Sequence, residues 1–100
     1  GPVTGDPLGH RVESILAEFG REVFTPREYQ VAQLMLQGHS PGSVAKILEL
    51  GLETVKMHRK HIYAKLNISS QPELLALFIE LLTSTQERQG KDYLQQYLKE

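Results

Sequence analysis

The sequence predicts an all-α domain, and three observations support this fold class. Apolar residues recur at the three- and four-residue spacing of a helix in every periodic segment. No segment alternates apolar and polar residues as a half-buried strand would. A capping Ser or Thr shortly before a proline, the usual start of a helix, occurs at Thr25-Pro26, Ser40-Pro41 and Ser70-Gln71-Pro72. With 100 residues, 40% of them hydrophobic, the chain suffices for one domain with a modest core.

Composition excludes several functions. Cysteine is absent, so disulfides and thiolate metal ligands are excluded. No apolar run approaches the ~20 residues of a membrane helix, and no signal-peptide pattern opens the chain, so we expect a cytoplasmic protein without a membrane partner. Gly1-Pro2 looks like the remnant of a cleaved expression tag, which suggests a piece of a longer protein. There is no glycine-rich phosphate loop or carboxylate pair, so we expect neither catalytic residues nor a cofactor.

Residues 1–23 are predicted to form a lead-in and a short helix. Residues 1–8 are rich in glycine and proline and should be flexible. A helix ended by Gly20 is predicted from four apolar residues at i, i+3, i+4 and i+7, namely Val12, Ile15, Leu16 and Phe19. Two interpretations stay open: this helix packs on the domain, or it is the end of a linker from an absent sensory domain.

The clearest helix start in the chain lies at Thr25. Thr25 can cap, Pro26 suits the first helical position, and Glu28 can reach back to complete a capping box. The buried stripe of this helix consists of Val31, Leu34 and Met35. Gly38 supplies the left-handed residue that ends it.

A second, shorter helix follows Ser40-Pro41 and ends before Gly51. Its apolar face consists of Val44, Ile47 and Leu48. We expect Gly51 to adopt the left-handed conformation in the turn that reverses the chain. A short helix, a glycine-containing turn and a following helix that is basic on its outer face form the layout of a helix-turn-helix.

Residues 54–66 carry the most informative pattern. At about 100° per residue, one narrow arc holds Val55, Ile62 and Leu66. The opposite arc holds Glu53, Met57, Lys60 and Ala64, with Lys56 beside them. Residues 54–72 include four basic and no acidic residues, so we expect Lys56 and Lys60 to lack a compensating partner. One face is therefore predicted to join the core, and the other to present lysines to a polyanion.

The next helix should start with a third capping box, from Ser70 to Glu73, and run to about Thr83. Its apolar residues cover more than half of the circumference: Leu74, Leu75, Leu77, Phe78, Ile79, Leu81 and Leu82. A small domain cannot bury that whole surface, so we expect a homodimer interface that includes Leu75, Ile79 and Leu82. Alternatively, the terminal segments cover it. A last short helix within residues 84–100 is predicted from Tyr93, Leu94, Tyr97 and Leu98.

A specific set of motifs occupies some sixty residues from Phe24 to about Leu82. They are Thr25-Pro26-Arg27-Glu28, Gly38 with Ser40, Ala45 with Leu48, Thr54-Val55-Lys56 with His58, Ile62, Lys65-Leu66, and Ser69-Ser70 with Glu73. With these motifs the chain resembles the LuxR/NarL-type (FixJ/GerE-type) helix-turn-helix domain of bacterial transcription regulators. The resemblance implies a four-helix domain over residues 24–83, here with short extra helices at the N- and C-termini.

The resemblance also implies functional roles. The helix at about 52–66 would enter the DNA major groove, and the helix at about 71–83 would form the homodimer contact. Base-reading positions are matched by Lys56, Met57 and Lys60. Backbone-contacting or supporting positions are matched by Thr54, His58 and Lys65. Arg59 lies nearer the core arc than the outer arc, so either a phosphate contact at the rim or helix packing suits it. The implied partners are double-stranded DNA with a pseudo-palindromic site, a second copy of the chain and RNA polymerase, at the bacterial nucleoid.

The chain departs from the family pattern at several positions. Gly51 stands where the family usually has a capping serine, a loss of only a few tenths of a kcal/mol. Pro41-Gly42 and Gln71 replace residues that usually include a lysine and an arginine, so we expect weaker nonspecific DNA binding. Met57 cannot donate a hydrogen bond and could only touch a thymine methyl group or fill space.

Two other functions, metal binding and protein interaction, also have some support in the sequence. His58 and His61 are three residues apart, but no third ligand lies nearby in the sequence, so we expect no metal site. A protein-interaction module is favoured by the pI near 6.5, below the value of about 9 typical of nucleic-acid-binding domains. Against it, salt screens charges beyond roughly 10 Å, so a docked phosphate would respond mainly to the local basic patch.

Overall fold

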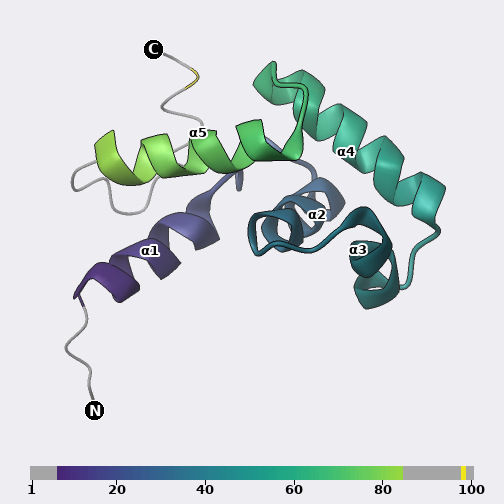
Figure 1. Cartoon of the computed structure of the whole chain (residues 1–100), viewed down its shortest axis with the longest axis horizontal. Coiled ribbons are helices and arrows are strands. Elements are labelled where there is room, and N and C mark those ends of the chain that lie inside the picture. The colour runs from purple at the N-terminus through teal and green to yellow at the C-terminus, as the bar shows by residue number, and fades with distance from the viewer. Residues whose placement is uncertain (1–6, 85–97, 99–100) are drawn as a thin grey trace.

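The computed structural model describes residues 7–84 and residue 98, and its helices are labelled in Figure 1. They are α1 (Pro7–Glu18), α2 (Pro26–Leu36), α3 (Pro41–Leu48), α4 (Leu52–Leu66) and α5 (Gln71–Ser84). This part of the chain contains no strand, so the all-α prediction is confirmed. The bounds of α4 and α5 agree with the helices predicted at about 52–66 and 71–83.

The predicted helix starts are present. At α2, Thr25 Oγ1 accepts from the Glu28 N–H at 3.2 Å and Glu28 Oε1 accepts from the Thr25 N–H at 3.0 Å, which completes the capping box. At α3, Ser40 Oγ accepts from the N–H three residues later at 3.2 Å. At α5, Ser70 Oγ accepts from the Glu73 N–H at 3.4 Å and donates to the Glu73 carboxylate at 3.1 Å. Local capping chemistry therefore sets where these helices begin.

The residue that adopts the left-handed conformation differs from the prediction in one turn. Gly38 has φ 97° after α2, as predicted. Between α3 and α4, however, Glu49 has φ 57° and Gly51 has φ −70°, so the prediction of a left-handed Gly51 is wrong. The reason is that α3 closes earlier, with the Leu50 N–H bonded to the Ala45 carbonyl at 2.9 Å. Gly51 instead caps the start of α4 in an extended conformation without a side-chain hydrogen bond.

One hydrophobic core connects the helices. α4 packs across α2 and α3, and α5 contacts both α1 and α2. Figure 1 shows α4 at one end of the molecule and α1 at the other. Val55, Ile62 and Leu66 are buried in the core, so the predicted inner stripe of α4 is confirmed.

α1 belongs to the same core. Ile15 and Phe19 are fully buried, and the Phe19 ring meets the Phe78 ring edge-on at a centroid distance of 5.7 Å. α1 therefore packs on the domain, one of the two interpretations left open above. It begins at Pro7, so the lead-in predicted for residues 1–8 is shorter than expected. The helix ends at Glu18, close to Gly20, the residue predicted to end it, and Gly20 has a left-handed conformation with φ 77°.

Two predicted apolar faces are only partly buried. On α3, Val44 is buried but Ile47 is about half exposed, because it lies ~60° around the helix from Val44. On α5, Leu75 and Ile79 are about half exposed, while Leu82 is half-buried. Leu98 is helical and partly exposed, and the rest of the predicted terminal helix lies outside the described residues: Tyr93, Leu94 and Tyr97.

Candidate nucleic-acid interface

α4 presents opposite faces to the core and to solvent. Behind it lie the buried side chains of Val55, Ile62 and Leu66. On the outer face, Lys56, Met57 and Lys60 are all exposed, and 58% of the Met57 surface is accessible. The three residues assigned to base reading therefore lie together on the surface, within one to two turns of the helix.

The charges on the outer face are compensated unequally. Lys56 Nζ lies 3.8 Å from Glu53 Oε2, so the expectation that Lys56 lacks a partner is wrong. Glu53 immediately precedes the acid-free stretch and stands three residues before Lys56, within reach on one helix face. Such exposed ion pairs contribute only about 0 to 1 kcal/mol to stability. Lys56 can therefore release the Glu53 carboxylate and bind another anion instead. Within the described part of the chain, Lys60 has no ion pair.

Thr54, His58 and Arg59 flank the outer face. Thr54 is exposed near the start of α4, whereas His58 and Arg59 are half-buried. Burial raises the pKa of the Tyr63 hydroxyl above its usual value, the positive charge of Arg59 opposes this rise, and the charge of Glu73 adds to it. Arg59 stands four residues before Tyr63, so the two side chains lie one turn apart on α4.

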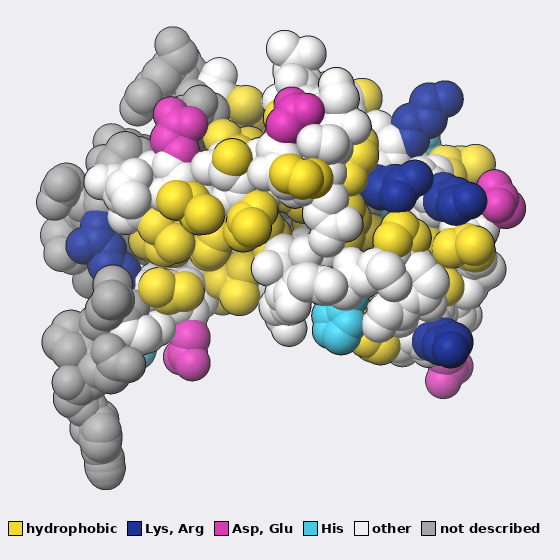
Figure 2. Space-filling view, viewed as in Figure 1, with side chains coloured by type: hydrophobic (Ala, Val, Ile, Leu, Met, Phe, Trp, Pro, Cys, Tyr) yellow, Lys and Arg dark blue, Asp and Glu magenta, His cyan; other side chains and the backbone are white. Residues whose placement is uncertain are grey.

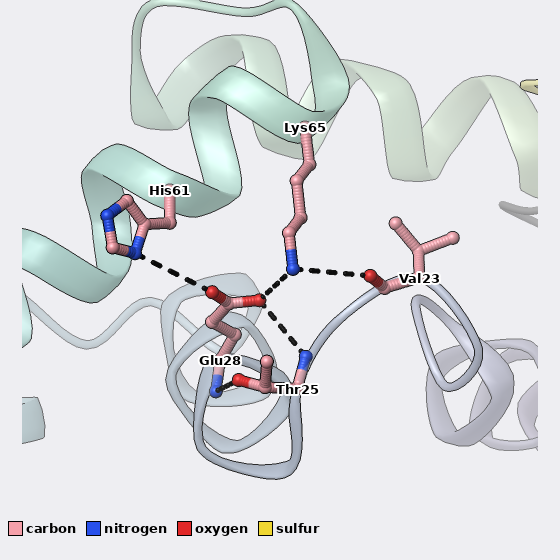
Figure 3. A network of polar contacts seen from close by, with 5 residues as sticks. All are labelled: Val23, Thr25, Glu28, His61 and Lys65. Carbon is pink, nitrogen blue, oxygen red and sulfur yellow. Dashed lines mark hydrogen bonds and ion pairs between the residues drawn. The ribbon is translucent and has the colours of Figure 1, made fainter.

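Lys65, which the resemblance matches to a backbone contact or support, makes polar contacts with other segments of the same chain (Figure 3). Its Nζ donates to Glu28 Oε1 at 2.6 Å and to the Val23 carbonyl at 3.5 Å. The Thr25 N–H donates to the same Glu28 oxygen at 3.0 Å. His61 Nδ1 lies 3.7 Å from Glu28 Oε2, an ion pair only when the imidazole is protonated. One carboxylate on α2 thus contacts two α4 side chains, one helical turn apart.

The environment of Glu28 favours its charged form. Burial of the carboxyl is the largest single influence and raises its pKa. The hydrogen bonds from Lys65 and from the Thr25 N–H, together with the positive charges of Lys65 and His61, outweigh this effect. The pKa of Glu28 therefore lies below its ordinary value of 4.5, and the carboxylate is ionised at neutral pH.

Sequence reasoning assigned Glu28 only to the capping box and Gln71 only to a lost positive charge. Glu28 and Lys65 are 37 residues apart, and no local pattern pairs them. The one available signal is that Glu28 stands three residues before buried Val31, on the inner side of α2. Gln71 Nε2 donates to the Met35 carbonyl at 3.1 Å and so ties the start of α5 to the end of α2.

Two kinds of surface are separated on the molecule. Figure 2 shows Lys and Arg side chains gathered over the end formed by α3 and α4, and hydrophobic side chains gathered over α5 and beside α1. Among the described residues, no three His, Asp or Glu side chains form a group that could hold a metal ion. In the same part of the chain, no helix has the length and apolarity required to cross a membrane.

The short α3, the three-residue turn and the outward basic face of α4 define a helix-turn-helix domain, the DNA-binding class of fold. The family model described as "Bacterial regulatory proteins, luxR family" matches residues 22–78, more than half of the chain. The chain therefore belongs to the luxR family of DNA-binding transcription regulators, as the sequence resemblance implied.

Individual relatives agree with this assignment. The chain is 46% identical over 75 residues to a protein of Aeromonas salmonicida named "Putative HTH-type transcriptional regulator in exeN 3'region", covering 75% of this chain and 38% of that protein. It is 35% identical over 81 residues to the nitrate/nitrite response regulator protein NarP of Escherichia coli, covering 73% and 38%. It is 33% identical over 54 residues to the oxygen regulatory protein NreC of Staphylococcus epidermidis, covering 54% and 25%. The chain thus spans well under half the length of these relatives. No solved structure matches it significantly.

Proposed function

We propose that this chain is the output domain of a bacterial transcription regulator and binds double-stranded DNA sequence-specifically through α4 in the major groove. The family assignment supports the DNA-binding class. The observation that carries the groove assignment is the exposure of Lys56, Met57 and Lys60 on the side of α4 opposite its buried stripe. The major groove of DNA is about 12 Å wide and admits an α-helix, whose diameter including side chains is about 10–12 Å.

The side chains suggest a division of roles on this face. Lys60, which has no ion pair within the described residues, would donate to guanine O6 and N7. Lys56 would do the same after exchanging Glu53 for DNA. Met57 would contact a thymine methyl group. Thr54, His58 and Arg59 flank this face and would fix the register of the helix on phosphates.

A homodimer is the second part of the proposal. Leu75 and Ile79 leave about half of their surface exposed on α5, and Leu82 is half-buried beside them. Pairing α5 with its copy across a two-fold axis would cover these side chains. Two α4 helices would then read half-sites about 10 bp apart in a pseudo-palindromic site at the nucleoid, where the bound dimer could meet RNA polymerase.

A fluorescence-anisotropy titration of labelled mixed-sequence duplex DNA tests the central proposal. We expect binding at 50 mM salt that weakens steeply toward 200 mM, because phosphate contacts release counterions. A protein making 6–10 such contacts loses about 10³- to 10⁵-fold in affinity over that range. Polyglutamate with the same total charge as the duplex, added as a competitor, controls for attraction to any polyanion. It should displace little of the bound DNA. Absence of binding at 50 mM salt would reject the proposal.

A protein-interaction module is the second candidate. It is favoured by exposed apolar side chains on and near the helix-turn-helix, Ile47 and Leu52, and by the net charge of −1. In that case the basic face of α4 would be only solvated or would meet an acidic protein. The same titration separates the two candidates, since this one predicts no DNA binding at low salt.

A further inference from the structure

Glu28 is the one charged side chain buried among the described residues, with 5% of its surface accessible. It lies in the first turn of α2, where its carboxylate completes the capping box with Thr25. A capping carboxylate needs only its own helix start, and most are exposed to solvent. The burial of Glu28 against α4 therefore indicates a task beyond capping.

The contacts of Glu28 connect three segments. Oε1 receives hydrogen bonds from Lys65 Nζ at 2.6 Å and from the Thr25 N–H at 3.0 Å, while Oε2 faces His61 Nδ1 at 3.7 Å. Lys65 also donates to the carbonyl of Val23, in the connection between α1 and α2. The second half of α4 is thereby tied to the N-terminal end of α2 by directional contacts, as Figure 3 shows.

Directional contacts matter because the three buried residues of α4, Val55, Ile62 and Leu66, are all apolar. Their burial holds α4 against the domain, but the hydrophobic effect is non-directional, so hydrogen bonds of fixed length add a constraint on the rotation of the helix. With side chains reaching about 5–6 Å from the axis, a rotation of ~10° moves their tips by ~1 Å. Lys60 directly precedes His61, so such a rotation would misplace its amine against a base edge.

We propose that Glu28 is a positioning residue for DNA recognition: through Lys65 and His61 it sets the rotation of α4, and thereby sequence discrimination, without touching DNA. This inference rests on the proposed function. It competes with the sequence-based assignment of Lys65 to the DNA backbone. A phosphate contact by Lys65 would affect all DNA sequences alike, whereas positioning affects the preferred site most.

The test compares Glu28→Gln, Lys65→Gln, their double variant and Lys65→Arg with the wild type. Glutamine at position 28 retains a capping-box residue, and Lys65→Arg retains a cation that can reach the carboxylate. Each protein is titrated with a site selected from a random duplex library and with mixed-sequence duplex, over a range of salt concentrations. Circular dichroism at the assay temperature restricts the comparison to folded proteins.

Positioning predicts that Glu28→Gln and Lys65→Gln each lower the ratio of specific to nonspecific affinity by about tenfold, the loss of roughly one base contact. The double variant should be no worse than either single one, Lys65→Arg should recover most of the ratio, and the salt slope should not change. A Lys65→Gln variant that loses equal affinity for both DNAs, with a salt slope smaller by about one, would overturn the inference in favour of a phosphate contact. If Glu28→Gln does not fold, the Lys65→Gln and Lys65→Arg pair decides the question.

A readout without DNA separates failure of this inference from failure of the proposed function. Amide chemical shifts of Glu28→Gln should change along the length of α4 (Leu52–Leu66) if the helix rotates. Shift changes confined to residues beside Glu28 and Lys65 would contradict positioning, even in a protein that binds DNA. Wild-type protein that binds no duplex would instead reject the proposed function itself.

Discussion

Lys65 on α4 and Glu28 on α2 form a hydrogen-bonded ion pair with an Nζ to Oε1 distance of 2.6 Å, although 37 residues separate them in the sequence. The carboxylate side chain is 6% accessible and the lysine side chain 37% accessible. The pair is therefore asymmetric: the cation can be resolvated if its partner is lost, but the anion cannot. This asymmetry determines which substitutions should destabilise the domain.

Lys65→Met should lower the free energy of unfolding by about 1–3 kcal/mol, because it leaves a buried carboxylate without its charged donor. Urea denaturation followed by circular dichroism measures this change. Arg21→Gln is the matched control: its ion pair with Glu18, at 3.7 Å, lies at the surface and should contribute less than ~1 kcal/mol. Equal losses of unfolding free energy in the two variants would show that the ion pair between Glu28 and Lys65 stabilises the domain no more than an exposed pair does.

Stability should also depend on pH through Glu28. Its pKa is lower in the folded than in the unfolded protein, so the unfolded chain binds more protons in the acid range. The contribution of Glu28 is therefore fully present above about pH 4.5 and is lost as the pH falls through the folded pKa. Glu28→Gln should reduce the slope of unfolding free energy against pH below 4.5, the range in which the carboxyl itself titrates. A variant with the wild-type acid slope would contradict this account.

The local features of the fold could be predicted from the sequence, whereas the long-range polar contacts could not. Helix starts depend on neighbouring residues, so Thr25 and Ser40 identified them correctly. The left-handed residue after α3 was misplaced because glycine is only the preferred residue for that conformation, and Glu49 adopts it instead. The Glu28 to Lys65 pair depends on how α4 crosses α2, and nothing within either helix encodes that crossing.

Gly51→Ser should stabilise the domain by a few tenths of a kcal/mol, since serine can supply the side-chain cap that α4 lacks. The site accepts a side chain: φ is −70°, and, apart from its chain neighbours, a Cβ would approach Thr54 Oγ1 most closely, at 3.9 Å. Gly20→Ser is the contrast, because φ is 77° there and a Cβ would lie 2.4 Å from the Phe24 ring. Thermal denaturation should show a small rise in Tm for the first and a clear fall for the second. A fall for Gly51→Ser would show that the missing cap costs nothing.

Leu75→Glu and Ile79→Glu should shift the protein toward monomer in sedimentation-velocity experiments, because each places a charge in the proposed α5 interface. Both residues are about half exposed, so the fold should tolerate the change. Ala76→Glu is the matched control on the same helix, exposed but outside the apolar arc, and should leave the dimer intact. If all three variants keep the wild-type mass, the interface lies elsewhere.

The most direct test of DNA recognition by α4 is the ratio of affinities for a selected site and for mixed-sequence duplex, measured for wild type, Lys60→Ala and Arg11→Gln. Arg11→Gln removes one positive charge from α1, at the opposite end of the molecule from α4 (Figure 1). Loss of a base contact worth about 1–3 kcal/mol predicts a ratio roughly 5- to 150-fold lower in Lys60→Ala. Arg11→Gln should retain the wild-type ratio. A Lys60→Ala protein that discriminates between the two DNAs as well as the wild type does would contradict the assignment of α4 as the reading helix.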